Sequence, residues 1–137
     1  MNLVIDTNIF IASLLRDGKI RELIVNSPFN LIIPEAIYEE IIEHKEELIL
    51  KSRLDEEDFN TVSSLISKYV TIIPDTQTKT FKEKAKEIIG HIDKDDIPII
   101  ATSLKFNFCP IWTDDSDFKK QDKIKIFTTK EIIDFQQ

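Results

Sequence analysis

The chain has 137 residues, of which 42% are hydrophobic and 31% are charged, and its formal net charge is −7. This length and composition exclude a disordered chain and two large domains, so we expect one domain over residues 1–137. No apolar run approaches the ~18–20 residues that a membrane helix needs, which predicts no membrane partner. The acidic net charge at first disfavours a nucleic-acid partner, because phosphate binding needs clustered lysine and arginine.

Few residues of this chain suit metal or nucleophilic chemistry other than its carboxylates. Cys109 is the only cysteine, and His44 and His91 are the only histidines. An internal disulfide and a cysteine-based zinc site are therefore excluded, and a Ser-His-Asp triad is disfavoured. The single cysteine fits a reducing compartment, so we expect a cytoplasmic protein. We assign no role to either histidine, and any catalysis would depend on carboxylates.

Short apolar runs alternate with segments of helical periodicity along the chain. The first run, Leu3–Ile5, stops at Asp6-Thr7-Asn8 and precedes a helix that begins near Ile9 and includes Leu15–Arg16. In chain order we then expect a strand at 31–33, a helix from Pro34 to about Leu50, a helix over 55–68, a strand at 69–73, a helix through 81–89, a helix that begins between Asp93 and Ile97, strands at 109–113 and 123–127, and a helix from Thr128 or Thr129.

The order of these elements predicts the fold class. Strands that alternate with helices imply right-handed crossovers and a sheet covered on both faces. We therefore expect an α/β fold, a three-layer α/β/α sandwich with a five-stranded, mainly parallel sheet. Residues 114–118 are expected to form a loop, and the strand at 123–127, with its alternating lysine and isoleucine, is expected at a sheet edge.

Acidic residues occur where predicted strands end or helices begin. Asp6 ends the first strand, Asp93–Asp96 open the helix before the fourth strand, and Asp114, Asp115 and Asp117 follow that strand. Open parallel sheets bind ligands outside the carboxyl ends of their strands, where the strand order reverses. If the order reverses between the first and fourth strands, these acids share one crevice. Crowded carboxylates repel each other unless a cation balances them, and oxygen ligands alone suit Mg²⁺ or Mn²⁺.

The same residues resemble the PIN domain family over the full length of the chain. The similarity begins at Val4-Ile5-Asp6-Thr7-Asn8 and includes Trp112-Thr113-Asp114-Asp115-Ser116-Asp117-Phe118. The resemblance implies a metal-dependent endoribonuclease with Mg²⁺ or Mn²⁺ as cofactor and RNA as substrate. Many small members of the family are the toxin of a toxin–antitoxin pair of the VapBC kind. We therefore expect a homodimer and, for a toxin, a small antitoxin partner.

Carried over residue by residue, the resemblance implies two sets of site residues. The catalytic and metal-binding set is Asp6, Glu40, Asp96 and Asp115, with Asp117 as a fifth metal ligand and Asp93 in an assisting position. The substrate-binding set is Asn8, Thr113, Lys119 and Lys120, in which the Thr113 hydroxyl could hold a metal ligand or a phosphate and the lysines could engage an RNA backbone. Family spacing alone chooses Glu40 over Glu39, Asp96 over Asp95 and Asp115 over Asp114.

Simpler roles are available for several of these residues. Asp6-Thr7-Asn8 and Asp93–Asp96 suit helix capping, Asp114–Asp117 suits an Asx-rich turn, and the nearby lysines could protect a sheet edge. Convergence of the acids on one crevice favours the catalytic interpretation, because independent caps have no reason to cluster. With these acids balanced by metal, the rest of the chain would be only weakly acidic. Trp112 is expected in the core.

Two other functions remain open from the sequence. The first is a phosphatase with Asp6 as nucleophile, which is disfavoured because Asn8 stands where that class has a second aspartate. The second is a PIN-shaped module that binds RNA without cleaving it, and the retained acids count against it.

Overall fold

The computed structural model describes residues 1–15 and 18–137, and its centre is a five-stranded sheet in the order β3-β2-β1-β4-β5. The strands are β1 (Asn2–Ile5), β2 (Asn30–Pro34), β3 (Val70–Ile73), β4 (Ile111–Trp112) and β5 (Ile126–Phe127). All four strand pairings are parallel. The predicted five-stranded parallel sheet is confirmed, and β5 lies at its edge as predicted.

The strand order reverses between β1 and β4, as the position of the acids required. On one side of β1, Ile5 pairs with Trp112 of β4. On the other side of β1, Leu3 pairs with Leu31 of β2. The residues that follow this first pair, Asp6 and Thr113, therefore leave the sheet side by side. This is the position at which open parallel sheets bind their ligands.

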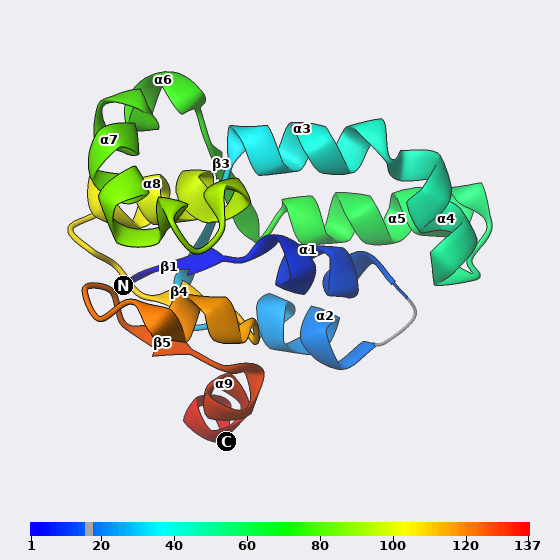
Figure 1. Cartoon of the computed structure of the whole chain (residues 1–137). Coiled ribbons are helices and arrows are strands. Elements are labelled where there is room, and N and C mark those ends of the chain that lie inside the picture. Colours follow the sequence, from blue (N-terminus) through cyan, green and yellow to red (C-terminus); the bar gives the residue numbers. More distant parts are fainter. Residues whose placement is uncertain (16–17) are drawn as a thin grey trace.

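Helices cover the sheet on both sides, and Figure 1 shows α6, α7 and α8 on the left of the view and α1 to α5 on the right. Their bounds are α1 (Thr7–Leu14), α2 (Gly18–Val25), α3 (Glu35–Glu43), α4 (Lys45–Ser52), α5 (Glu56–Ser67), α6 (Asp75–Thr78), α7 (Lys82–Ala85), α8 (Ile97–Lys105) and α9 (Thr129–Gln136). Shorter helical segments are η1 (Lys79–Phe81), η2 (Lys86–Gly90), η3 (Lys94–Asp96) and η4 (Ser116–Lys120).

The core lies between the sheet and these helices. Leu3, Val4 and Ile5 of β1 have no exposed surface, and neither have Ile99 and Ile100 of α8, which packs against β1 and β2. A central parallel strand is buried on both faces, which explains why β1 reads as an unbroken apolar run. Trp112 also lies in the core, as predicted, and its indole Nε1 donates a hydrogen bond of 3.0 Å to Thr129 Oγ1.

Several predicted elements differ from the structure in extent. The helix from Pro34 to about Leu50 is two helices, because the backbone at His44 leaves helical geometry with φ −102° and ψ 20°. The predicted strand at 123–127 keeps only Ile126–Phe127, because the Gln121 side chain accepts hydrogen bonds from the backbone N–H groups of Lys123 and Ile124 and turns the chain there.

Other differences concern helical segments. The predicted loop at 114–118 enters the 3₁₀ helix η4, and the helix through 81–89 ends in the π-helical segment η2. The helix α2 had no counterpart among the predicted elements. Arg16, expected at the end of the first helix, lies outside the described residues. No helix in the described part of the chain has both the length and the apolar character needed to span a membrane.

Candidate active site

Asp6 is a buried carboxylate held by two hydrogen bonds. It follows β1 and caps α1, and Thr7 N donates to its Oδ1 over 2.7 Å. The hydroxyl of Thr113, which follows β4, donates to its Oδ2 over 2.6 Å. Burial raises the pKa of Asp6 above its ordinary value, and these two hydrogen bonds only partly oppose that rise. The carboxylate is only 3% exposed, so its two oxygens are fixed in direction.

Asp96 lies at the start of α8 and is 9% exposed. Its Oδ2 is buried and has no hydrogen-bond partner among the described residues. Burial raises the pKa of Asp96 to about 7, and the charges of Asp93, Asp6, Asp115 and Asp117 add to that rise. The topology thus brings Asp96 from α8 close to acids that follow β1 and β4.

The structure separates the members of the adjacent pair Asp95 and Asp96. Asp95 is exposed, and its backbone N–H donates a hydrogen bond of 2.9 Å to Oδ1 of Asp93. Asp93 caps the short helix η3, and its charge also raises the pKa of Asp96. Asp96 is therefore the acid of this pair that faces the other carboxylates.

The pair Asp114 and Asp115 separates in the same way. Both oxygens of Asp114 are engaged by Thr129 of α9, with Thr129 N at 2.7 Å and Thr129 Oγ1 at 2.6 Å. The backbone N–H of Asp115 donates to Thr113 Oγ1 over 3.0 Å. The charge of Asp115 raises the pKa values of Asp6 and Asp96, and the charge of Asp114 raises that of Asp6 to a smaller extent. Asp114 attaches α9, and Asp115 faces the buried acids.

Asp117 completes this group of acids at its exposed side. Its backbone N–H donates to Asp115 Oδ1 over 2.9 Å, and its own carboxylate pairs with Lys120 Nζ at 2.9 Å. The hydrogen bond from Lys120 to Asp117 raises the pKa of the lysine. Sequence reasoning missed this pair, although the spacing i, i+3 on a helical segment could have indicated it.

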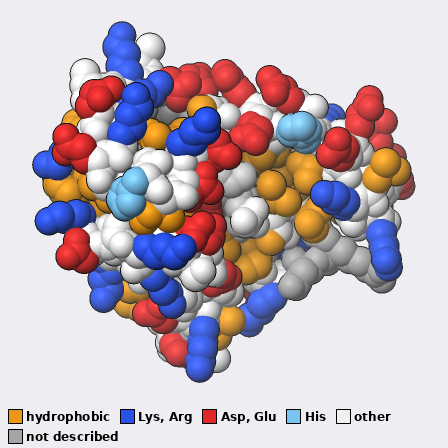
Figure 2. Space-filling view, in the orientation of Figure 1, with side chains coloured by type: hydrophobic (Ala, Val, Ile, Leu, Met, Phe, Trp, Pro, Cys, Tyr) orange, Lys and Arg blue, Asp and Glu red, His pale blue; other side chains and the backbone are white. Residues whose placement is uncertain are grey.

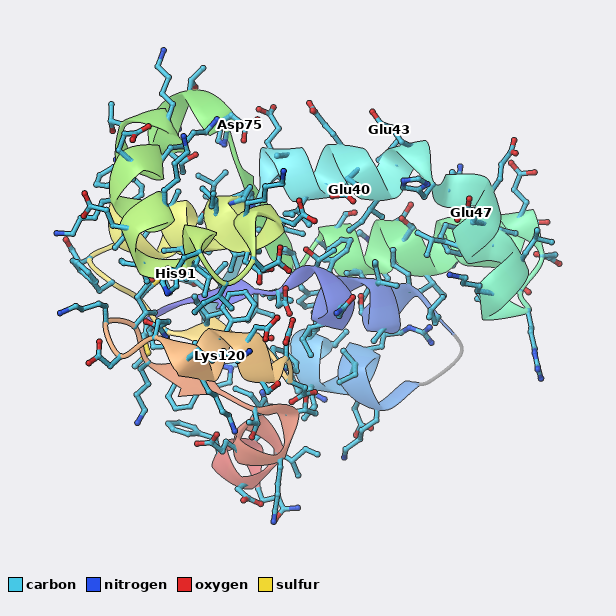
Figure 3. The ribbon with its side chains drawn as sticks, viewed as in Figure 1. Glu40, Glu43, Glu47, Asp75, His91 and Lys120 are labelled. Atoms are coloured by element: carbon cyan, nitrogen blue, oxygen red, sulfur yellow. The ribbon has the colours of Figure 1, made fainter. Side chains whose placement is uncertain are left out.

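Glu40 lies in a neighbouring hollow and not among these acids. It is exposed on α3 and lines a hollow of about 190 Å³ together with Thr7 and Ile11 of α1, and Glu39 does not line it. Figure 3 shows Glu40 on the side of α3 that faces α1, whereas Glu43 points outward. The charge of Glu40 is not among those that raise the pKa values of Asp6 and Asp96.

The predicted substrate-binding residues lie in different surroundings relative to the acids. Thr113 has no exposed surface, and its hydroxyl donates to Asp6 and accepts from the N–H of Asp115, so it holds one of the proposed metal ligands, the first of its two expected roles. Lys119 is exposed, and its charge lowers the pKa of Glu131 on α9. Asn8 is exposed and makes no side-chain hydrogen bond within residues 1–15 and 18–137. Of the two predicted lysines, Lys120 contacts an acid of this group directly, through its ion pair with Asp117.

The acids that the structure brings together are Asp6, Asp96, Asp115 and Asp117, and this donor set fits a hard divalent cation. Nowhere in the described residues are three or more His, Cys, Asp and Glu side chains already arranged to hold a metal ion. Mg²⁺, however, is usually bound by one or two carboxylates and keeps several waters. The oxygen of Asp96 has no partner, and burial together with repulsion from the nearby acids raises the pKa of this carboxyl; a bound cation would relieve both conditions.

The surface around these acids is divided by chemical type. Figure 2 shows carboxylates gathered near the middle of this face, with many lysines and arginines on the left and exposed hydrophobic side chains on the right. Most of the lysines and arginines on this face therefore lie on one side of the central acids, and a few lie on the other.

The comparisons with known proteins agree with this geometry. The fold is similar to a chain in the crystal structure of VapBC2 from Rickettsia felis bound to a DNA fragment from their promoter, with a TM-score of 0.69 and 13% sequence identity. That match covers 93% of this chain and 98% of the other, and at this identity it shows the fold alone. No curated protein sequence matches. The profile of the PIN domain family matches residues 4–134, and the chain therefore belongs to the PIN domain family.

Proposed function

We propose that this protein is an endoribonuclease that depends on Mg²⁺ or Mn²⁺ and cleaves RNA phosphodiester bonds. The observation that carries the proposal is the buried, partnerless Oδ2 of Asp96, which is crowded by Asp6, Asp115 and Asp117. Membership of the PIN domain family supports the same class of chemistry. Among the described residues, Lys120 forms an ion pair with this oxygen-only cluster, and its side chain is more than half exposed.

Each acid has a distinct part in the proposed site. Asp6 is held by Thr113 and Thr7 so that its carboxylate keeps one orientation, and Asp96 offers its free oxygen. Asp115 supplies a second acid from the β4 side, and Asp117 supplies the outer one. When bound, the metal ion supplies a Lewis acid that lowers the pKa of water and offsets negative charge on the reacting phosphate.

Glu40 and the remaining residues act at the margin of this site in the proposal. Glu40 lines a hollow with Thr7, the residue after Asp6, and in the proposal it would join the metal-binding set through water. Lys120 and Asn8 are exposed beside the acids and would contact the RNA. The alternative of an Asp6 nucleophile is disfavoured, because Asp6 is 3% exposed and both its oxygens accept hydrogen bonds.

The biological setting is part of the same proposal. The similar fold in the VapBC2 complex supports a toxin with a small antitoxin partner, and we propose a cytoplasmic homodimer for this chain. The antitoxin would act by covering the carboxylates. A copurified small protein, identified from a gene next to this one, would test this part separately from the chemistry.

The decisive experiment compares matched acids within each adjacent pair. Asp96→Asn should reduce metal-dependent cleavage of a mixed RNA pool by on the order of 100-fold, whereas Asp95→Asn on the exposed neighbour should leave the rate near that of the wild type. Asp115→Asn and Asp114→Asn should differ in the same way. Cleavage would be measured with Mn²⁺ and with EDTA. Equal rates within both pairs, or cleavage that persists in EDTA, would refute the proposal.

A further inference from the structure

A groove of about 410 Å³ lies beside the acids, on the far side of Lys120. Three separate segments form it, namely α7 and η2 with the turn after them, the loop after α8, and the end of η4 with the loop after it. Its main lining residues are Lys84, Ile88, His91, Phe108, Lys120 and Lys123. Figure 3 shows His91 and Lys120 on neighbouring elements of this side of the molecule. The volume is within the ~300–1,000 Å³ that small-ligand sites occupy.

Phe108 gives this groove an exposed aromatic ring. The residue is 43% exposed and has φ 59°, in the left-handed region that bulky residues rarely adopt. Asn107 before it has the same φ, so two consecutive left-handed residues carry the ring to the surface. The Nζ of Lys84 lies 5.5 Å from the ring centroid. An exposed ring beside a cation is an arrangement on which a nucleic-acid base can stack.

The groove is locally basic in an acidic protein. Three lysines line it, against the two acids Glu87 and Asp122, whereas the whole chain carries −7. Lys120 belongs to both places, because it lines the groove and its Nζ lies 2.9 Å from Asp117. A strand whose reacting phosphodiester reached the acids would therefore meet Lys120, at the edge of the groove, with its next phosphate.

We propose that this groove binds one nucleotide of a single-stranded RNA, next to the phosphodiester that the acids cleave. The base would stack on Phe108, and the phosphate would lie between Lys84, Lys120 and Lys123. This inference rests on the proposed function. It adds a binding site for a part of the RNA that does not contact the carboxylates. It requires that the RNA be single-stranded here, because a paired base cannot reach the ring.

Binding of a fluorescein-labelled oligouridine RNA, measured in EDTA so that cleavage does not interfere, tests the groove directly. Phe108→Ala should weaken binding by on the order of tenfold, because stacking on an aromatic ring contributes strongly per base. Phe108→Trp should retain affinity, and emission of the introduced indole should be quenched as RNA is added. Trp112 has no exposed surface, so it gives a constant background. Lys84→Gln and Lys123→Gln should each lower the logarithmic salt dependence of the affinity by about 0.7.

Matched controls come from the same chain. Phe135 is 59% exposed on α9 and Lys68 is exposed at the end of α5, and neither lines the groove. Phe135→Ala and Lys68→Gln should leave the affinity unchanged. Unchanged affinity in Phe108→Ala, together with constant emission in Phe108→Trp, would overturn the groove proposal even if the wild type cleaves RNA. A wild type that neither binds nor cleaves RNA would instead refute the proposed function itself.

Discussion

The hydroxyl of Thr113 donates a hydrogen bond of 2.6 Å to Oδ2 of Asp6, and the two residues are 107 positions apart in the sequence. The same hydroxyl accepts the backbone N–H of Asp115 at 3.0 Å. One buried threonine therefore fixes both an acid that follows β1 and the start of the loop that follows β4. The geometry of the candidate site depends on this contact between neighbouring strand ends.

Replacement of this hydroxyl should damage stability and activity together. Thr113→Val keeps the shape but leaves Asp6 Oδ2 and the N–H of Asp115 without their partner, which should lower the free energy of unfolding by about 1–3 kcal/mol. The pKa of Asp6 should rise further, because a hydrogen bond that lowers it is lost. Urea unfolding and RNA cleavage with Mn²⁺ measure the two effects. Thr113→Ser is the control, since it keeps the hydroxyl. A valine variant as active as the serine variant would contradict the assignment.

Asp114 should behave as a structural residue. Its two hydrogen bonds to Thr129 attach the start of α9 to the end of β4. Asp114→Ala should therefore destabilise the protein by about 1 kcal/mol and increase hydrogen exchange in α9, while the cleavage rate of the folded protein stays near that of the wild type. Hydrogen exchange followed by mass spectrometry measures the first effect. A loss of cleavage without faster exchange in α9 would place Asp114 in the site.

The parallel sheet and the position of the acids at its strand ends could be predicted from the sequence because each depends on local patterns, whereas the full strand order was not predicted. Leu3–Ile5 reads as a buried strand, and Asp6 marks its end. Alternation of strands and helices leaves few topologies, and among these the ligand crevice has a fixed place. The neighbouring positions of β1 and β4 follow from the same reasoning.

Periodicity and composition could not choose within the acidic pairs, which were separated by family spacing alone, and could not name the partners of the Thr113 hydroxyl, because both depend on long-range contacts. Asp114 differs from Asp115 only because Thr129 of α9 lies beside it. Asp95 differs from Asp96 because η3 turns one acid outward and the other inward. The break at His44 and the shortening of β5 also depend on local hydrogen bonds that hydrophobic periodicity does not report. The sequence pattern therefore predicts where the candidate site lies, and long-range packing determines which acid of each pair faces it.

Removal of the Asp96 charge should stabilise the protein in a pH-dependent way. The pKa of Asp96 is 3.8 in the unfolded reference and about 7 in the folded protein, so between these values the native state holds a proton that the unfolded chain has released. Raising the pH through this window therefore destabilises the wild type and not Asp96→Asn. In EDTA, the gain in unfolding free energy from Asp96→Asn should grow between pH 4 and pH 7 and level off above. Urea unfolding over this range measures it, and a gain independent of pH would show that Asp96 is not crowded.

Removal of the Asp115 charge should stabilise the metal-free protein and reduce the stabilisation that a metal ion provides. The charge of Asp115 raises the pKa values of Asp6 and Asp96, so Asp115→Asn should raise the melting temperature in EDTA, and the asparagine can still accept the N–H of Asp117 through Oδ1. A metal ion that binds only the native wild type stabilises it by RT ln(1 + [L]/Kd), about 2.7 kcal/mol at a hundredfold excess over Kd. Metal should stabilise the variant less than the wild type, because the variant has one negatively charged ligand fewer.

Thermal melts of both proteins and of the control Asp95→Asn, in EDTA and in Mn²⁺, test this prediction. Equal metal responses in all three proteins would show that Asp115 holds no metal, and a wild type indifferent to Mn²⁺ and Mg²⁺ would favour a module that binds RNA without cleaving it.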